Sequence, residues 1–458
     1  EPGVKCMTMD GRQELSGARR PNAPERDAFW NALRHATGSS LDLRAGEALC
    51  AIAYVKRRFP RVFHALRVEG MPGGWTLHGW PLEPGVPSVA WIAAAPWWAE
   101  VIRAEDVSRQ ALERVIEAAS AIDADYGESD SDLRCVREAY EIREARLRAE
   151  GGSPRGFRRL TKLDGSVFFL EDLRLREREG MSEAQEREMI RALAALGKGK
   201  PAPFYAILLM DGDSLGKHLG TPELQPRISG ALRRFTASVP GIVDGHSGFL
   251  IYAGGDDVLA LLPLDTALPC AAAIRQSYLD AFDGSGIPAT ISAAVEFVHI
   301  KRPLNRVLNH AHQLLDDIAK EGRGRDAIAV RVTKPGGEHL VWAQPWKIAL
   351  DDTRQPVVCA LAARFAEESR LSEGFSSKFF YRIRERFALM EGTKDAPPLP
   401  EAVQRALLAT DYLNSAENRN RLSFAEAEAA IAGLLRQCTP HRRNPDDGSI
   451  TSEGRIAV

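Results

Sequence analysis

The sequence predicts an α+β fold in which a ferredoxin-like sheet domain is flanked by helical domains and preceded by a small irregular unit. Two observations lead to this prediction. A continuous apolar run at 204–210 opens a series of segments in the order strand, helix, hairpin, helix, strand, helix, strand. On both sides of that series, apolar residues recur at helical spacing over long stretches.

The length of the chain indicates several domains. Its 458 residues exceed one ordinary core, since about 150 residues per domain is typical. Gly and Pro interrupt the apolar segments before residue 84, and KGKPAP at 198–203 cannot continue a helix. We therefore predict a small α+β unit at 1–84, a helical domain at 85–199, the sheet domain at 200–340 and a C-terminal helical domain at 341–458.

The sheet domain divides into short segments, each with a hydrophobic pattern typical of a strand or a helix. The run FYAILLM at 204–210 is apolar throughout, as in a strand buried on both faces, and it ends in Asp211-Gly212-Asp213. Two apolar runs at 249–253 and 258–262 flank Gly254-Gly255-Asp256-Asp257, which predicts a hairpin with the glycines at its positive-φ positions. The remaining segments are predicted as helices at 222–239, 266–282 and 303–321 and as strands at 289–300 and 327–332.

The flanking regions are predicted to be mainly helical. In the first of them, an acidic, Ser-rich break at 123–132 separates two helices, and Ser182 with Gln185 forms a capping box for a helix that ends near Leu196. Helical spacing resumes beyond Trp346 and continues to about Leu435. We expect the tail after Cys438 to be poorly ordered.

Composition limits the classes of function. A formal net charge of −2 gives no global field that would attract nucleic acid, so any phosphate-binding surface must be local. Two basic stretches, at 143–178 and 301–334, are interpreted either as binding surfaces or as solvated helix faces. The six cysteines form no compact framework, which is typical of a reducing compartment. The longest apolar run, near 89–102, is too short to span a bilayer.

Four acidic residues form the main candidate site. Asp211 and Asp213 end a predicted strand, and Asp256 and Asp257 lie on a hairpin that can pair beside it. Crowded carboxylates repel one another unless a hard cation neutralises them, and Mg²⁺ takes carboxylates together with phosphate oxygens. Two such ions can activate a ribose hydroxyl and stabilise departing pyrophosphate. Alone, either motif is equally well explained as a turn, but together they favour a metal site with Asp211, Asp256 and Asp257 as catalytic acids.

Neighbouring residues are candidates for nucleotide binding. Gly254 and Gly255 allow close backbone approach, and the turn Ser214-Leu215-Gly216 offers N–H groups to a triphosphate. Lys320 and Arg323 either balance phosphate charge or complement the end of a helix. His299, His310 and His312 are interpreted as structural or surface histidines, because no ligand pattern accompanies them.

These motifs resemble a known family in their order along the chain. The runs PFYAILLMDGDSLGKHLG, LIYAGGDDVLALLPL, TISAAVEFVHIKRPL and AKEGRGRDAIAVRV are similar to the large palm subunit of type III CRISPR RNA-targeting complexes of the III-B (Cmr) kind. Weaker similarity extends to LDGSVFFLEDL at 163–173 and to the terminal helices. The fold implied is a palm of the nucleotidyl cyclase/polymerase type.

The resemblance also implies a function. It predicts a cytoplasmic subunit of an antiviral complex with other Cmr subunits, a guide RNA and a target RNA, and no membrane partner. When target RNA binds, such a subunit converts ATP to cyclic oligoadenylate with two Mg²⁺ or Mn²⁺ ions. By the matching positions, Asp211, Asp256 and Asp257, with Gly212, contact metal, and the turn Gly212, Asp213, Ser214, Leu215 and Gly216 contacts the triphosphate.

The sequence departs from the family in two respects. Relatives often carry paired C-x-x-C elements for zinc, but here the pairs read Cys6 with Met9 and Cys50 with Ala53. Two thiolates do not make a closed zinc site, so zinc is not expected unless His35 or His64 completes one. Relatives also carry an HD nuclease domain, and no His-Asp dipeptide occurs here. Nuclease activity is therefore not expected from these residues, and the family's first palm-like domain would lie mostly before Glu1.

Two alternatives remain open at this point. One is a catalytically silent scaffold that organises guide RNA and neighbouring subunits, although a decayed palm has no functional reason to keep several mutually repelling acids. The other is a stand-alone cyclase of the diguanylate type, against which the long flanking helical regions argue.

Overall fold

The structure is a computed structural model that describes residues 3–9, 11–37, 43, 47–79, 86–122, 124, 133–149, 151, 157–171, 173, 181–337, 339–366, 377–390, 399–414 and 422–452. Contacts between residues divide the chain into two compact units, Glu1–Val86 and Pro87–Val458. Within the second unit, our division into a helical domain, a sheet domain and C-terminal helices stays a prediction.

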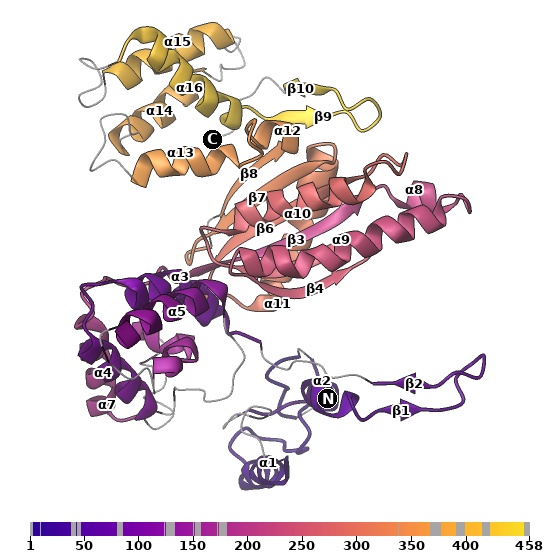
Figure 1. The fold of residues 1–458 in the computed structure, drawn as a ribbon, viewed down its shortest axis with the longest axis vertical. Helices are drawn as coiled ribbons and strands as arrows, with labels where there is room; N and C mark the ends of the chain where they lie inside the picture. Colours follow the sequence, from indigo (N-terminus) through magenta and orange to yellow (C-terminus); the bar gives the residue numbers. More distant parts are fainter. Residues whose placement is uncertain are drawn as a thin grey trace. The chain divides into compact units, whose positions relative to one another are not determined.

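The first unit is small and irregular, as predicted. It contains the helices α1 (Pro24–Thr37) and α2 (Ala51–Phe63) and a short antiparallel hairpin of β1 (Arg67–Val68) and β2 (Leu77–His78) (Figure 1). Its core consists of Cys6, Trp30, Leu43, Ala48, Leu49 and Cys50. The Trp30 indole donates a hydrogen bond of 2.7 Å to the buried carboxylate of Glu14, which satisfies both groups inside this core.

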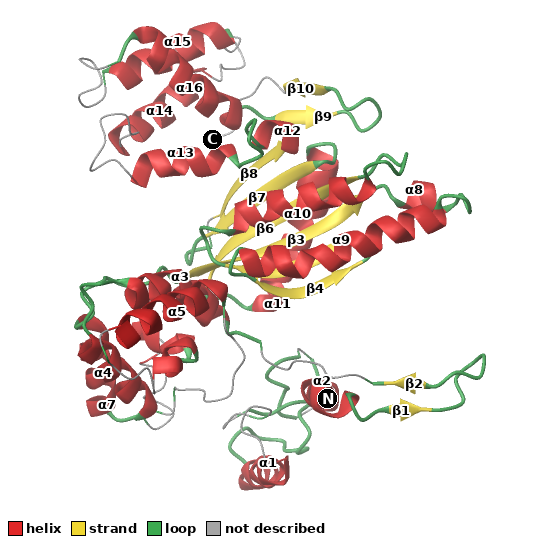
Figure 2. Cartoon of the chain, viewed as in Figure 1, coloured by secondary structure: helices red, strands yellow, loops and turns green. Residues whose placement is uncertain are grey.

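The second unit is built around one six-stranded mixed sheet in the order β4-β5-β3-β6-β7-β8. The helices α9 and α10 lie side by side across one face of it (Figures 1 and 2). Only the β6–β7 pair is parallel. The strand and helix order matches the predicted one, and the α+β fold with a ferredoxin-like sheet is confirmed. The elements are β3 (Phe204–Asp213), α8 (Gly216–Leu219), α9 (Gln225–Gly245), β4 (Phe249–Gly254), β5 (Asp257–Leu262), α10 (Ala267–Phe282), β6 (Thr290–His299), α11 (Leu304–Gln313), η3 (Leu314–Gly322), β7 (Ala327–Thr333) and β8 (His339–Pro345).

The central strand β3 is buried on both faces because alternate side chains enter two different cores. Ala206, Leu208 and Met210 pack with α9 and α10. Tyr205, Ile207 and Leu209 pack on the other side, in a core that also contains residues of α11 and η3. By this alternation Asp211 continues the row on the side of η3.

The helix predicted at 303–321 is two elements in the structure. It is α-helical as far as Gln313 and then becomes a π-helix, η3. Three consecutive residues with positive φ follow: Gly324 at 78°, Arg325 at 67° and Asp326 at 44°. π-Helical segments and runs of left-handed residues are frequent at functional sites.

The helical region before the sheet shares a continuous core with it, in which Trp91 and Trp98 are fully buried. The predicted capping box of Ser182 and Gln185 is confirmed, whereas the predicted break at 123–132 lies outside the described residues except Ala124. The elements are α3 (Val89–Arg103), α4 (Arg109–Ser120), α5 (Arg134–Ala149), η1 (Phe157–Thr161), η2 (Gly165–Phe168) and α7 (Glu183–Ala194).

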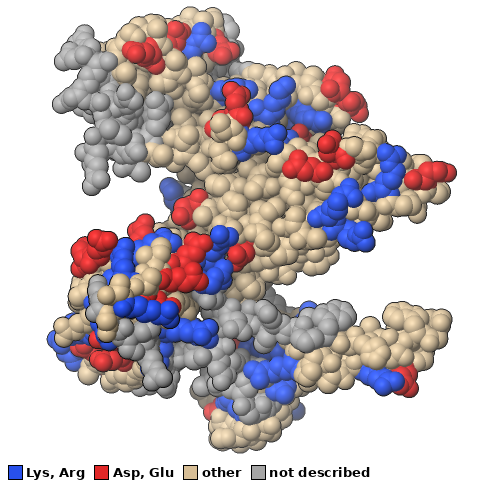
Figure 3. Space-filling model, viewed as in Figure 1, with Lys and Arg blue, Asp and Glu red and all other residues tan. Residues whose placement is uncertain are grey.

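The basic stretch at 143–178 is in part structural. Arg143 is buried and donates hydrogen bonds to the carbonyls of Ala104 and Val107, and Arg146 donates to that of Arg103. Figure 3 shows basic and acidic side chains intermixed over α5 and its neighbours on the face in view. These observations favour solvated helix faces over a binding surface for the described part of the stretch.

The C-terminal region contains α12 (Trp346–Ala349), α13 (Val357–Ala366), α14 (Ser377–Met390), α15 (Glu401–Leu413) and α16 (Phe424–Cys438). The expectation of a poorly ordered tail after Cys438 is wrong for residues 439–452, and residues 453–458 lie outside the described residues. Residues 439–452 continue into an antiparallel hairpin of β9 (His441–Arg443) and β10 (Ile450–Ser452). The hairpin is ordered because β8 and the turn after η3 supply partners for its backbone, and those partners lie far away in the sequence.

Candidate metal and nucleotide site

Three carboxylates converge at one end of the sheet. Each of Asp211, Asp256 and Asp257 offers an oxygen, and these oxygens all lie within 4.8 Å of one another. The cause is the antiparallel register, in which Met210 pairs with Val258 and so brings the next residue of β3, Asp211, beside Asp257 at the start of β5. The structure thus brings together the three acids that the sequence singled out.

Gly212 makes room for Asp256. A Cβ atom on Gly212 would lie 2.5 Å from Oδ2 of Asp256 and 2.7 Å from the hydroxyl of Tyr278. No side chain other than hydrogen fits there without moving one of them. Tyr278 is fully buried, and among the described residues its hydroxyl has no hydrogen-bond partner. Nothing in the sequence indicated that Tyr278 lies beside the site, because a tyrosine on the apolar face of a helix is usually a core residue.

Burial and the neighbouring negative charges raise the pKa values of two of the acids. Burial, contact with the Asp211 carboxylate and the charges of Asp211 and Asp256 together raise the pKa of Asp257 from 3.8 to about 6, although Lys320 opposes the shift. Burial, followed by the charge of Asp211, also raises the pKa of Asp256. A hard cation would relieve this repulsion, and carboxylate oxygens are the ligands that Mg²⁺ and Mn²⁺ prefer. The donor set therefore fits divalent cations.

Lys320 places a positive charge on the cluster. Its ammonium, on η3, donates a hydrogen bond to Oδ2 of Asp211 and lies 3.6 Å from Oδ1 of Asp316. Burial alone would lower the pKa of Lys320, but its interactions with Asp211, Asp316 and Asp213 outweigh burial and raise that pKa. Lys320 therefore stays charged beside the acids, where it can also meet a phosphate.

Asp213 does not join the acidic pocket, contrary to the sequence interpretation. Its carboxylate is buried and accepts hydrogen bonds from the hydroxyls of Thr290 (2.9 Å) and Ser292 (2.8 Å) and from the backbone N–H of Asp326 (2.9 Å). Burial raises the pKa of Asp213 while these donors lower it, and burial prevails. The carboxylate acts as a tie between β3, β6 and the start of β7. Strand periodicity placed Asp213 beside Asp211 and gave no sign of these partners.

The predicted nucleotide-contacting turns adjoin the triad along the chain, one after Asp211 and the other before Asp256. Ser214 has a φ of 59°, Leu215 is buried, and α8 begins at Gly216 but has only four residues, so its dipole is small. In the other turn, Gly255 has a φ of 66° with open space on its Cβ side. Gly254 lies in β4 without the predicted positive φ, and a Cβ atom there would lie 2.2 Å from the Tyr252 hydroxyl.

Arg323 points elsewhere. Its guanidinium donates a hydrogen bond of 3.0 Å to the carbonyl of His441 in β9, so it holds the C-terminal hairpin. This contact differs from the phosphate partner that the sequence offered, but Arg323 is the C-cap residue of η3, which agrees with the alternative interpretation as a helix-end charge. His299 accepts a hydrogen bond from the backbone of Lys301, and His310 Nδ1 lies 3.6 Å from the buried carboxylate of Glu296, as expected of structural histidines.

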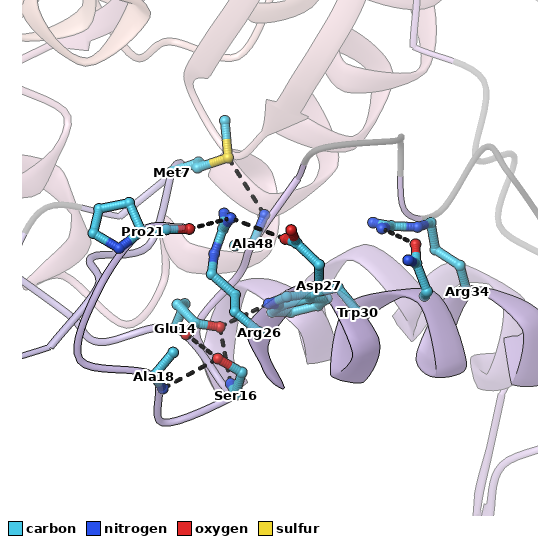
Figure 4. Close-up of polar contacts among 11 residues, drawn as sticks. Met7, Glu14, Ser16, Ala18, Pro21, Arg26, Asp27, Trp30, Arg34 and Ala48 are labelled. Carbon is cyan, nitrogen blue, oxygen red and sulfur yellow. Dashed lines mark hydrogen bonds and ion pairs between the residues drawn. The ribbon is translucent and has the colours of Figure 1, made fainter. Parts of the chain in front are cut away.

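The cysteine pair of the first unit forms a sulfur-lined core. The Cys50 N–H donates to the Cys6 sulfur at 3.1 Å, and the Cys50 thiol lies 3.6 Å from the Met9 sulfur. The Met7 sulfur also accepts a hydrogen bond of 3.3 Å from the Ala48 N–H (Figure 4). Burial raises the pKa of Cys6, but hydrogen bonds from Thr8 and Cys50 outweigh it and lower that pKa to about 7.

This donor set does not fit a structural zinc ion. Such an ion takes four nitrogen, thiolate or carboxylate ligands. In the part of the chain that the structure describes, the only cluster of three or more His, Cys, Asp or Glu side chains that could hold a metal ion is the acidic triad of the second unit.

Among the described helices, none has both the length and the apolarity needed to cross a membrane.

Comparison with known proteins agrees with the fold. Residues 204–329 match the family model described as Cas10/Cmr2, second palm domain. The "CRISPR system Cmr subunit Cmr2" of Pyrococcus furiosus is 28% identical over 306 residues, which cover 60% of this chain and 33% of the relative. The "CRISPR system CMR subunit Cmr2" of Saccharolobus solfataricus is 29% identical over 141 residues, which cover 26% of this chain and 13% of the relative.

Among solved structures, a cryo-EM structure of "Type III-B Cmr-beta bound to cognate target RNA" aligns with 93% of this chain and 52% of its own chain. The TM-score is 0.52 at 15% sequence identity, which shows a shared fold. The alignments thus span a third or less of the curated relatives and about half of the solved chain. Residues 204–329 of this chain are therefore similar to the second palm domain of Cas10/Cmr2 proteins.

Proposed function

We propose that this chain is a palm subunit of a type III-B CRISPR RNA-guided complex and that it joins ATP molecules into cyclic oligoadenylate when target RNA binds. The observation that carries the proposal is the convergence of Asp211, Asp256 and Asp257 on one point, with oxygens within 4.8 Å. Burial first, and the neighbouring carboxylates second, raise the pKa values of Asp256 and Asp257, and perturbed carboxylates of this kind are typical of functional sites.

In this proposal Asp211, Asp256 and Asp257, with the backbone of Gly212, hold two Mg²⁺ or Mn²⁺ ions. When bound, such ions favour the deprotonated form of a ribose 3′-hydroxyl and neutralise pyrophosphate. The chain's own residues bind and orient the nucleotide. Gly254 and Gly255 let the backbone approach the nucleotide, the turn from Gly212 to Gly216 contacts the triphosphate, and Lys320 supplies a buried positive charge beside it.

The surrounding structure supports rigid placement of these groups. Asp213 ties the end of β3 to β6 and β7, and Asp326 is held in turn by two hydrogen bonds from Arg275, of 3.0 and 3.1 Å. Arg275 also lies 5.6 Å from the ring centre of Trp346. Ligands that are fixed from behind in this way hold metal better than mobile ones.

The test uses the assembled complex with guide RNA, ATP and Mg²⁺, with and without target RNA, and identifies products by mass spectrometry. Target RNA should trigger a cyclic adenylate in wild type and none in the Asp256→Ala/Asp257→Ala variant, which should still assemble. Undiminished synthesis by the double variant would refute the mechanism. Absence of any new nucleotide from wild type would favour the silent scaffold, and a product from GTP alone would favour a diguanylate-type cyclase.

A further inference from the structure

The C-terminal hairpin lies directly on the turn that follows η3. The Arg443 N–H of β9 donates a 2.8 Å hydrogen bond to the carbonyl of Arg323, whose guanidinium returns one to His441. A Cβ atom on Gly324 would lie 1.8 Å from the carbonyl oxygen of Arg443, so the two backbones are in full contact. Gln344 of β8 holds the start of the hairpin by donating 2.8 Å to the carbonyl of Thr439.

The turn itself is strained and is fixed at both ends. Gly324, Arg325 and Asp326 all have positive φ, a conformation that residues other than glycine keep only where the surroundings enforce it. At the far end, Asp326 donates its N–H to Asp213 and accepts from Arg275. At the near end, β9 covers Gly324.

This turn is bonded to the backbone of Lys320. The N–H groups of Gly324 and Arg325 both donate to the Lys320 carbonyl, at 3.1 and 3.0 Å, and the Arg323 N–H donates to Ile318 at 2.9 Å. A cavity of about 290 Å³ borders Asp317, Ile318 and Arg323, between η3, β8 and the end of α16. Leu314, Leu315 and Ala319 are buried in the core that η3 shares with the sheet. The position of Lys320 therefore depends on the turn as well as on this packing.

We propose that the β9–β10 hairpin is a positioning element for Lys320. The hairpin holds the turn 323–326 in its left-handed conformation and thereby fixes η3. The Lys320 ammonium then bonds Asp211 before a nucleotide binds and lies next to the triphosphate afterwards. This inference rests on the proposed function, because it assigns Lys320 to the nucleotide. It makes Arg323 and Gly324 positioning residues that act through Lys320, far along the chain from the acids.

The proposal predicts two affinity changes of opposite sign. When the hairpin is released, Lys320 competes less with a cation for Asp211, so the affinity for Mn²⁺ alone should rise severalfold. At the same time the affinity for the α,β-methylene analogue of ATP with Mg²⁺ should fall severalfold. General damage to the fold would lower both affinities, so the opposite signs separate positioning from instability.

The variants are Gly324→Ala, which collides with Arg443, and Arg443→Pro, which removes the N–H that bonds Arg323. Gly337→Ala is the matched control. It carries the same cost of a left-handed alanine, at a φ of 92°, but meets only a side-chain atom of Arg302 at 3.9 Å, at the opposite end of β7 from the site. Mn²⁺ binding is measured by electron paramagnetic resonance and nucleotide binding by calorimetry, both on the full chain.

Lys320→Met provides the internal standard. It should show the same pair of opposite changes, and the double variant Gly324→Ala/Lys320→Met should add nothing to them. Wild-type affinities in both Gly324→Ala and Arg443→Pro, beside shifted ones in Lys320→Met, would overturn the positioning role and leave the proposed function standing. Additive effects, or a fall of both affinities, would overturn it too. Failure of the wild type to bind Mn²⁺ at all would instead refute the proposed function.

Discussion

Lys320 donates a hydrogen bond from its ammonium to Asp211, although the two residues lie 109 positions apart in the chain. The contact joins η3 to the end of β3, on the face of the sheet that Tyr205, Ile207 and Leu209 also occupy. One of the three converging carboxylates is thus paired with a protein cation, while Asp256 and Asp257 keep raised pKa values. The predictions below test this unequal distribution of charge and the groups that maintain it.

Removing the charge of Asp257 should stabilise the cation-free protein at neutral pH. In the folded chain the pKa of Asp257 is about 6, above its ordinary 3.8, so the folded state disfavours the charged form. The contribution of this group to the free energy of unfolding is therefore highest below pH 4 and falls as pH rises from about 4 to 6. Thermal unfolding in EDTA should show Asp257→Asn above wild type at about pH 7.5, with a difference that shrinks toward pH 4.

Saturating Mg²⁺ should reverse that order at neutral pH. A ligand stabilises the state that binds it, and the wild type offers one more carboxylate than the variant. A stability difference that does not change between pH 4 and pH 7.5 would contradict the raised pKa of Asp257. A difference that stays the same when Mg²⁺ is added would contradict the metal site.

Gly212→Ala should damage the site while leaving the fold intact. The new methyl group would take the space of the Asp256 carboxylate, at 2.5 Å from Oδ2. Misplacing a ligand should cost about 10–100-fold in Mn²⁺ affinity, comparable to the loss of a ligand's outer support. Calorimetric titration with Mn²⁺ measures this.

Gly220→Ala is the control for that variant, because nothing lies within 4 Å of its Cβ position. Its stability should stay within about 0.5 kcal/mol of wild type, as is usual for surface substitutions. If Gly212→Ala binds Mn²⁺ as tightly as Gly220→Ala does, Asp256 is not a ligand.

Asp213→Asn should act on stability more than on metal binding. The carboxylate of Asp213 accepts three hydrogen bonds in a buried position, and an amide there turns an N–H₂ group toward at least one donor. The free energy of unfolding should fall by about 1–3 kcal/mol in urea denaturation. Asp211→Asn should give the opposite pattern, with little loss of stability and a large loss of Mn²⁺ affinity. A greater loss of metal affinity in Asp213→Asn than in Asp211→Asn would restore Asp213 to the acidic pocket.

Zinc should be absent from the purified protein. Cys6 and Cys50 supply two thiols, and Met9 and Ala53 stand where two further cysteines would be needed for a closed site. Elemental analysis by mass spectrometry should find well below one zinc per chain, and chelators should leave the unfolding temperature of the first unit unchanged. One stoichiometric zinc ion would refute this prediction.

Much of the palm was predictable because its signals are local. The apolar run at 204–210 predicted a buried strand, and the two glycines before two aspartates predicted a turn, in which Gly255 has a φ of 66°. Antiparallel pairing of that hairpin with β3 then brings Asp211, Asp256 and Asp257 together. The candidate metal site therefore followed from periodicity and turn chemistry.

The sequence by itself thus determined the strand and helix order of the palm, because this order depends on patterns within a few residues. It also indicated the convergence of the three acids, because the hairpin that carries two of them can pair beside the strand that carries the third. Only the tertiary structure decided that Asp213 is tied into the sheet, that Lys320 pairs with Asp211 and that the segment after Cys438 forms a hairpin on Arg323. Each of these contacts joins residues more than 100 positions apart. No local pattern specifies such a partner, because it depends on which faces the packed elements present to one another.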